Sequence, residues 1–393
     1  MSQSNHNRQG TILVAPAAFK GTLGAVEAAR AMAAGARRGC PDCLVLERPV
    51  ADGGEQTARI LASALEGSLF AVDARDALDR PVVAEAANLG DGVFAVDAAS
   101  ACGMARLDRR DFDPLRATSF GLGMQLRELL DRGASEVIVG VGGTAFVDGG
   151  VGALQALGAQ FLDRRGRPIG SGGGSLVDLD RIHVGTLDAR VGAVAWILLL
   201  DVRNPLLGSN GAAVVYGPQK GATVQDVERL EHGLENLVRI VESLTGRELA
   251  DRPGMGAGGG LAVSLVGLLS AQSRPGASFV CECLGLSSLA RRADLVLTGE
   301  GRLDGQSLWG KAPVEVARQV RPTPVVALVG SVGAQAPQGL FDRCVAVSPD
   351  GPPSSDRAAR LLEQETAAVV ESYFGEDAPL GGGATTIMDA WRG

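Results

Sequence analysis

The chain is poor in aromatic residues and in clustered positive charge. Aromatic residues make up 4% of its 393 residues, charged residues make up 21%, and the formal net charge is −8. Proteins that bind nucleic acids or anionic membranes hold phosphate groups through clustered lysine and arginine. Because the sequence contains no such cluster, we expect neither a nucleic acid nor a membrane as partner.

Long apolar runs and histidine are also scarce. No apolar run approaches the roughly 20 residues that a membrane-spanning helix requires, and residues 1–10 are polar, without the apolar core of a signal peptide. We therefore expect a cytoplasmic protein. The three histidines, His6, His183 and His232, lie far apart in the sequence, so neither a Ser-His-acid nor a Cys-His catalytic group is supported.

Cysteine is too scattered for a convincing metal site. Two of the six cysteines form a Cys-x-x-Cys pair, Cys40 and Cys43, and two form a Cys-x-Cys pair, Cys281 and Cys283. A zinc site needs about four ligands at suitable spacing, and no histidine lies near these cysteines in sequence. We predict reduced, structural thiols, while a redox pair stays open as an alternative.

Hydrophobic residues and glycine are plentiful. Hydrophobic residues make up 46% of the chain. The chain is longer than the length that a single hydrophobic core usually supports, so we expect two domains. The 55 glycines are about twice the usual share of ~7%. Most lie in loops after apolar runs, a pattern typical of α/β enzymes whose loops bind ligands through the backbone.

Both ends of the chain alternate between strands and helices. At the start we predict strands at 11–15 and 44–48 with a helix at 22–39, and after residue 292 the same rhythm returns. Between them, from about residue 68, short apolar segments alternate with few helix signals. We predict one α/β parallel-sheet domain built from residues 1–75 and 286–393, with a second α/β domain, 76–285, inserted in it.

A glycine-rich loop follows the apolar run that begins at Val137. Gly142 and Gly143 allow a close approach of the backbone to a ligand, and Asp148 is the only charged residue between Glu136 and Asp163. The carboxyl ends of strands are where open α/β sheets bind ligands. We predict a ligand-binding loop here, with a turn whose glycines only relieve crowding as the alternative.

Asp201 lies near the end of a strongly apolar segment, Ala193 to Val202, which we predict to be a strand. An acid in such a position loses its hydration, and this loss must be compensated. We therefore predict that Asp201 contacts a metal ion or a substrate.

A third loop, Gly299–Ala312, carries charges of both signs. It lacks the third glycine of a dinucleotide fingerprint, and Ala312 replaces the hydroxyl residue that ends a P-loop. What remains is a glycine-rich loop suited to phosphate and metal, and an ordinary surface loop stays open as the alternative. Carboxylates, lysines and backbone amides without a nucleophile are typical of phosphoryl transfer.

Seven motifs stand in the same order as in the bacterial glycerate kinases of the first family, which the chain resembles over residues 11–335. They are Phe19–Gly21; Ala51–Glu55; Gly140–Gly143 with Asp148–Gly150; Asp201–Val202 with Asn204–Leu206; Gly217–Ala222; Gly256–Ala257 with Gly259–Leu261; and Thr298–Arg302 with Asp304, Gln306, Ser307, Gly310 and Lys311.

The resemblance implies a flavodoxin-like domain made from both chain ends, an inserted α/β domain and an active site in the cleft. It further implies ATP and Mg²⁺ as cofactors and a small hydroxy acid or polyol as partner, with D-glycerate phosphorylated on its 2-hydroxyl as the family default. A monomer or homodimer is expected.

The resulting prediction is an ATP-dependent kinase with three groups of site residues. For acceptor positioning, proton removal and Mg²⁺ contact we predict Lys20, Asp52, Asp148 and Asp201. For nucleotide binding we predict Gly142, Gly143, Glu300, Arg302, Asp304 and Lys311, and for the metal ion Asp201 and Glu300.

The chain departs from the family pattern at four positions. The family has Pro-Asp-Ser-Phe-Lys-Gly where this chain has Ala17 and Ala18, and Ala-Thr-Asn-Asp-Gly-Gly where it has Phe146 and Val147. One hypothesis is a less polar acceptor pocket and a kinase for another polyol, sugar acid or cyclitol. A binding protein without activity is a further alternative.

Overall fold

The computed structural model describes residues 10–348, 351 and 353–375. Within them, one sheet has five parallel strands in the order β15-β13-β11-β1-β2. Numbered within this sheet alone, the order is 2-1-3-4-5, which is the flavodoxin-like order. Its strands are β1 (Thr11–Val14), β2 (Leu44–Glu47), β11 (Leu295–Thr298), β13 (Val325–Val329) and β15 (Arg343–Ala346).

Helices cover both faces of this sheet, because successive residues of a strand point to opposite faces. Ile12 and Val14 pack toward α1 (Ala25–Gly39) and α12 (Ser355–Phe374), whereas Leu13 packs toward the opposite core. That second core includes α11 (Ala312–Val320), α10 (Leu286–Ala290) and α9 (Gly276–Cys283). Burial on both faces explains why β11 and β13 consist almost wholly of apolar residues.

The second sheet has six strands in the order β10-β9-β6-β5-β4-β3. Strands β3, β4 and β5 are antiparallel neighbours, whereas β5, β6, β9 and β10 run parallel. The bounds are β3 Ser68–Arg75, β4 Pro81–Gly90, β5 Val93–Asp97, β6 Glu136–Gly140, β9 Ala195–Leu200 and β10 Gln272–Pro275. The helices are α3 Ala98–Cys102, α4 Phe120–Asp131, α5 Val151–Ala156, α6 Ala212–Tyr216, α7 Val224–Thr245 and α8 Ala257–Leu268.

The predicted division of the chain needs one adjustment. Strand β3 pairs with β4 along its whole length, so residues 68–75 belong to the second sheet, whereas the sequence prediction placed them with the first. The strand pairing thus favours a boundary before Ser68. The division into an outer domain and an inserted domain stays a prediction.

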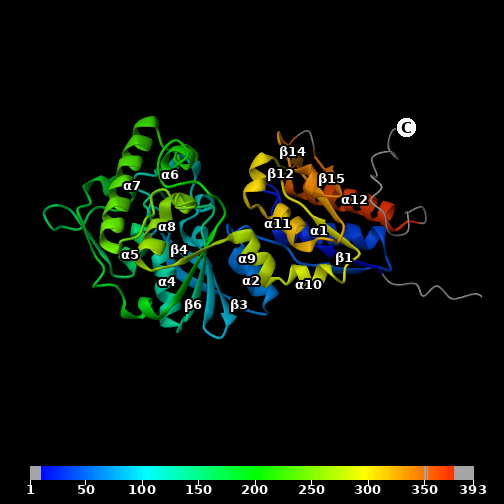
Figure 1. The fold of residues 1–393 in the computed structure, drawn as a ribbon, viewed down its shortest axis with the longest axis horizontal. Coiled ribbons are helices and arrows are strands. Elements are labelled where there is room, and N and C mark those ends of the chain that lie inside the picture. The colour runs from blue at the N-terminus through cyan, green and yellow to red at the C-terminus, as the bar shows by residue number, and fades with distance from the viewer. Residues whose placement is uncertain (1–9, 349–350, 352, 376–393) are drawn as a thin grey trace, which may run out of the picture.

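Figure 1 shows the two sheets in separate lobes, with α9 and α2 (Thr57–Ala64) where the lobes meet. Apolar residues of both lobes join in one core: Leu13 and Val296 come from the five-stranded sheet, and Ala95 and Ile138 come from the six-stranded sheet. Two small sheets complete the described fold, β7 (Gln160–Leu162) with β8 (Arg181–His183), and β12 (Arg302–Leu303) with β14 (Ser331–Val332).

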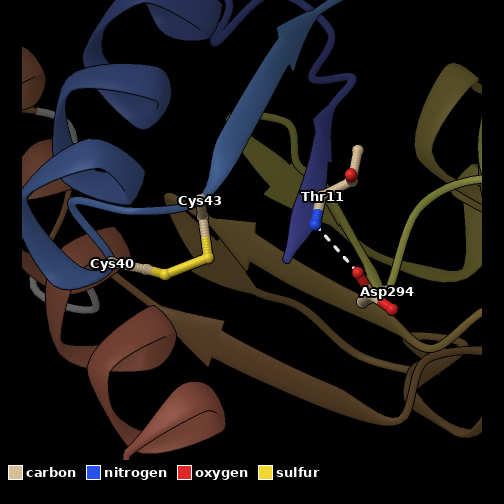
Figure 2. The surroundings of a disulfide bond; sticks show 4 residues. All are labelled: Thr11, Cys40, Cys43 and Asp294. Carbon is tan, nitrogen blue, oxygen red and sulfur yellow. Dashed lines mark hydrogen bonds between the residues drawn. A yellow bond between two sulfur atoms is a disulfide. The ribbon is translucent and has the colours of Figure 1, made fainter. Parts of the chain in front are cut away.

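Two local predictions were wrong. Helix α1 begins at Ala25, because Thr22 belongs to a tight turn in which its hydroxyl donates to the carbonyl of Phe19. Cys40 and Cys43 form a disulfide, shown in Figure 2, and are not the reduced thiols that were predicted. Their Cα atoms lie 5.4 Å apart because one turn connects the end of α1 to the start of β2, a separation that suits a disulfide.

Figure 2 also shows a hydrogen bond that joins the first residue of β1 to the residue before β11. The backbone N–H of Thr11 donates to the Asp294 carboxylate at 2.8 Å. No helix among the described residues is both long and apolar enough to cross a membrane.

Candidate active site

The predicted site residues gather at the carboxyl ends of strands from both sheets. In the five-stranded sheet the strand order reverses between β1 and β11, and ligands of open α/β sheets bind at such a switch point. The loops that follow these two strands are joined by a hydrogen bond from Ala17 N–H to the Gly299 carbonyl, 2.8 Å. These loops carry Lys20 and Glu300.

Asp52 connects the two halves of the site. It lies on the loop between β2 and α2. Burial raises the pKa of Asp201, at the end of β9, and of Glu300, after β11, and the charge of Asp52 adds to both shifts. The neighbouring Gly53 carbonyl accepts a hydrogen bond of 2.8 Å from the N–H of Val141, which follows β6. The loop that carries Asp52 is thereby held against the second sheet.

Asp201 is a half-buried carboxylate close to other charges. Burial, followed by repulsion from Asp52, raises its pKa to about 6, while the positive charges of Lys20 and Lys220 act in the opposite direction. Tyr216 is also nearby, since the charge of Asp201 contributes to raising the pKa of its phenol. The structure therefore brings Lys20, Asp52 and Asp201 together, as predicted for a phosphoryl-transfer site.

Gly142 brings two loops close to each other. A Cβ atom added there would lie 2.7 Å from the Cα of Gly54 and 2.9 Å from Oδ2 of Asp201. Any side chain at this position would push the two loops apart. This close packing supports the alternative in which the glycine relieves crowding. Nucleotide contact by Gly142 and Gly143 stays a prediction.

Asp148 differs from the other predicted acids because the protein itself satisfies its carboxylate. It is 1% exposed and accepts five hydrogen bonds: from the hydroxyl of Thr118, from the N–H and hydroxyl of Ser119, and from the N–H groups of Gly150 and Gly152. Burial raises the pKa of Asp148, and these bonds lower it. These contacts favour a structural role and weigh against the predicted catalytic one.

Four of the six residues predicted for nucleotide binding lie in the segment between β11 and α11: Glu300, Arg302, Asp304 and Lys311. Lys311 immediately precedes α11, and its Nζ lies 3.5 Å from Oε2 of Glu300, whose Oε1 accepts a hydrogen bond of 2.7 Å from Ser307. Burial raises the pKa of Glu300, and Lys311 opposes this shift. Arg302 is exposed and pairs with Asp304 at 3.4 Å.

Two buried charged residues near the site were missed as site residues. Lys220, which the sequence analysis included only within the Gly217–Ala222 motif, is buried beside the loop after β6. Asp97 ends β5 and accepts a hydrogen bond from the N–H of Ala58, at the start of α2. The signals that could have identified them are the glycine-flanked lysine of the Gly217–Ala222 motif and an acid at the end of an apolar strand.

The departures from the family pattern lie in two different environments. Phe146 and Val147 are 0% exposed in the core of the six-stranded lobe, so they are unsuited to lining an acceptor pocket. Ala17 and Ala18 are half-buried in the loop that carries Lys20. A changed acceptor pocket therefore rests on two residues and not on four.

The resemblance implies a Mg²⁺ ion, and carboxylates are the side chains that could hold it. Within the described residues, no group of three or more His, Cys, Asp or Glu side chains is arranged to hold a metal ion. Mg²⁺ in kinases needs only one or two carboxylates, because phosphate oxygens and water complete its shell. The repulsion between Asp52 and Asp201 is one that a divalent cation would relieve, so these two carboxylates fit this ion.

Carboxylates and lysines at the switch point of a flavodoxin-like sheet suit an enzyme that transfers phosphoryl groups. The family model described as "Glycerate kinase family" matches residues 12–373. The chain belongs to the glycerate kinase family.

Individual relatives agree. The chain is 40% identical over 335 residues to a glycerate kinase of Halalkalibacterium halodurans, covering 84% of this chain and 88% of that protein. It is 37% identical over 324 residues to a glycerate 2-kinase of Escherichia coli, covering 82% and 85%. A solved structure described as a glycerate kinase 2 of Salmonella typhimurium LT2 superposes with a TM-score of 0.79 at 34% identity, covering 92% of this chain and 97% of that one.

Proposed function

We propose that the protein is an ATP-dependent kinase that transfers the γ-phosphoryl group of ATP to the 2-hydroxyl of D-glycerate. The observation that carries this proposal is the group formed by Lys20, Asp52 and Asp201 across the two carboxyl edges, in a chain of the glycerate kinase family. The name of the Escherichia coli relative, glycerate 2-kinase, supports the choice of hydroxyl.

The charges divide into an acceptor side and a nucleotide side. We assign Lys20 to the carboxylate of glycerate, because it is a cation beside Asp201. Asp201 accepts the proton of the attacked hydroxyl, a task for which a pKa of about 6 is well placed. On the nucleotide side, Lys311 lies at a helix start, where a cation and free backbone N–H groups together favour phosphate.

Mg²⁺ neutralises phosphate charge when it is bound. Asp52 is our choice of ligand, because it lies between the acceptor carboxylate Asp201 and the nucleotide-side Glu300. Glu300 was predicted as a metal ligand, but it already accepts a hydrogen bond from Ser307 and pairs with Lys311. These contacts weigh against a metal role for Glu300. Because ATP is the phosphoryl donor, we place the enzyme in the cytoplasm.

The test is ADP release by the purified protein with Mg·ATP and D-glycerate, followed by identification of the phosphorylated product. We expect ADP release that depends on glycerate and on Mg²⁺, with 2-phosphoglycerate as product. A reaction without glycerate and one with L-glycerate are the controls.

A panel of polyols, sugar acids and cyclitols tests the acceptor. The double variant Ala17→Asp, Ala18→Ser restores the family pattern at the two half-buried departures. The changed-pocket alternative would replace our proposal under two conditions. The unmodified protein would have to phosphorylate a panel compound but not glycerate, and the double variant would have to phosphorylate glycerate. ATP turnover with no acceptor in the panel would contradict both.

A further inference from the structure

Lysine is rare in this chain, and its placement is not random. Of the 37 lysine and arginine residues only three are lysine: Lys20, Lys220 and Lys311. Lys20 and Lys220 act on Asp201, and Lys311 pairs with Glu300. Away from the site, the ion pairs of the described residues are formed by arginine. The three lysines thus mark the site, and the resemblance had assigned roles to two of them.

Lys220 is the buried member of the three. It is 4% exposed at the end of the short turn Pro218–Lys220, which follows α6. Its Nζ donates to the carbonyl of Phe146 at 2.7 Å and to the hydroxyl of Thr144 at 3.3 Å. Within the described residues it has no ion pair within 4.0 Å, so both acceptors are neutral. Burying an ammonium group on neutral acceptors is costly, which argues that the position has a use.

The charges that surround Lys220 come from two loops. Burial lowers its pKa to about 7, while the carboxylates of Asp148, in the loop after β6, and of Asp201, after β9, oppose this shift. An ammonium group has three donors, and two of them are used by Thr144 and Phe146. Lys220 therefore fastens the loop that contains Thr144 and Phe146.

The fastened loop is the one that shapes the site. Thr144 and Phe146 belong to the segment that also contains Gly142, whose backbone packs between Gly54 and the Asp201 carboxylate. A shift of this segment would move Gly142 against both loops. Because reacting groups in enzymes must be held closely, a displacement on the order of 1 Å can cost about 100-fold in rate.

We propose that Lys220 is a positioning residue of phosphoryl transfer, which holds the loop after β6 against the loops of Asp52 and Asp201. This inference rests on the proposed function. Arginine is no substitute in this position, because its guanidinium group has five donors and only two acceptors are present.

The experiment compares Lys220→Met and Lys220→Arg with the unmodified enzyme. The matched control is Gln219→Met, which alters the exposed neighbour in the same turn. For Lys220→Met we expect kcat to fall about 100-fold with little change in KM for ATP or glycerate. We expect Lys220→Arg to stay at least about tenfold below the unmodified enzyme, and Gln219→Met to match it.

Hydrogen exchange supplies a readout that does not depend on turnover. The amides of Ala145 and Gly149 are hydrogen-bonded to Cys102 and Gly259, and we expect both to exchange faster in Lys220→Met. Normal kcat in Lys220→Met, or full activity in Lys220→Arg, would overturn the proposal. Loss of kcat with unchanged exchange would also overturn it, since Lys220 would then act without holding the loop.

A folding defect in the variant and a failure of the proposed function can each be told apart from a failure of the Lys220 proposal. If thermal unfolding shows that Lys220→Met does not fold, Lys220→Gln takes its place with the same expected directions. If the unmodified protein releases no ADP with glycerate, the proposed function fails, and the exchange measurements alone then decide whether Lys220 holds the loop.

Discussion

The loop after β6 contains the buried Asp148 and the loop after β9 contains the half-buried Asp201, and the two aspartates are stabilised in different ways. Asp148 accepts five hydrogen bonds from protein groups. For Asp201 the neighbouring protein supplies repulsion from Asp52 and the charges of two lysines. The comparison teaches that burial by itself does not identify a site residue. What matters is whether the protein has already satisfied the buried group.

The largest effect is expected from Asp148→Ala. Oδ2 of Asp148 accepts four of the five hydrogen bonds, and an alanine supplies no acceptor for these donors. With two or more buried donors left unpaired, at about 1–3 kcal/mol each, we expect the free energy of unfolding to fall by roughly 3–5 kcal/mol. Denaturant unfolding measures it, and turnover per folded molecule should change little. A stable but inactive variant would contradict the structural role.

Asp201→Asn should show the opposite pattern. Removing this charge eliminates the proton acceptor, and comparable single-group losses cost ~10²–10³ in kcat, or about 3–4 kcal/mol. The free energy of unfolding should stay the same or rise, because the repulsion from Asp52 is relieved. Steady-state kinetics and thermal unfolding are compared with Asp251→Asn, an exposed acid of the same lobe. Near-normal kcat would show that the site lies elsewhere.

Asp97 is an intermediate case that sharpens the comparison. Burial raises its pKa to about 7 from an ordinary value of 3.8, despite hydrogen bonds from the backbone at the start of α2. The folded state therefore retains this proton above pH 4, whereas the unfolded chain releases it. The group's contribution to stability consequently falls as the pH rises from about 4 to 7.

In the unmodified protein, the Asp97 carboxyl should lower the free energy of unfolding by about 1.4 kcal/mol per pH unit, or about 2 kcal/mol between pH 5.5 and 7. We expect Asp97→Asn to lose this part of the pH dependence. Urea unfolding at both pH values measures it. Asp91→Asn, at an exposed turn, should keep the dependence of the unmodified protein. An unchanged slope in Asp97→Asn would mean that this carboxyl is ionised in the fold.

The smallest effect is expected from Lys311→Met. Glu300 is a buried acid that is compensated by a cation as well as by a hydroxyl, and the side chain of Lys311 is 26% exposed. We expect about a tenfold rise in KM for ATP, since solvent screens part of its charge. Arg318→Met, which removes an exposed cation from the same helix, is the control. An unchanged KM for ATP would remove Lys311 from the nucleotide side.

Much of the fold followed from local pattern. The apolar run from Ala193 to Val202 contains β9, and the return of strands and helices predicted after residue 292 is confirmed by β11, β13 and β15. Strands β11 and β13 are buried along their whole length, and such strands must be apolar. The short pair of β12 and β14 was missed because two-residue strands leave no periodic signal. The boundary predicted at residue 75 separates β3 from β4, although the two strands pair, because strand pairing depends on partners elsewhere in the chain.

By itself the sequence determined the family and the location of the loops, because glycines and charged residues at fixed spacing restrict the backbone wherever they occur. Only the tertiary structure decided what each acid does. Asp148 and Asp201 both follow apolar strands, yet the donors that satisfy Asp148 come from Thr118 and Ser119, about 30 residues earlier in the chain. The neighbours of Asp201 come from both lobes. A carboxylate's hydrogen bonds and charges act through space, so residues distant in sequence set its role.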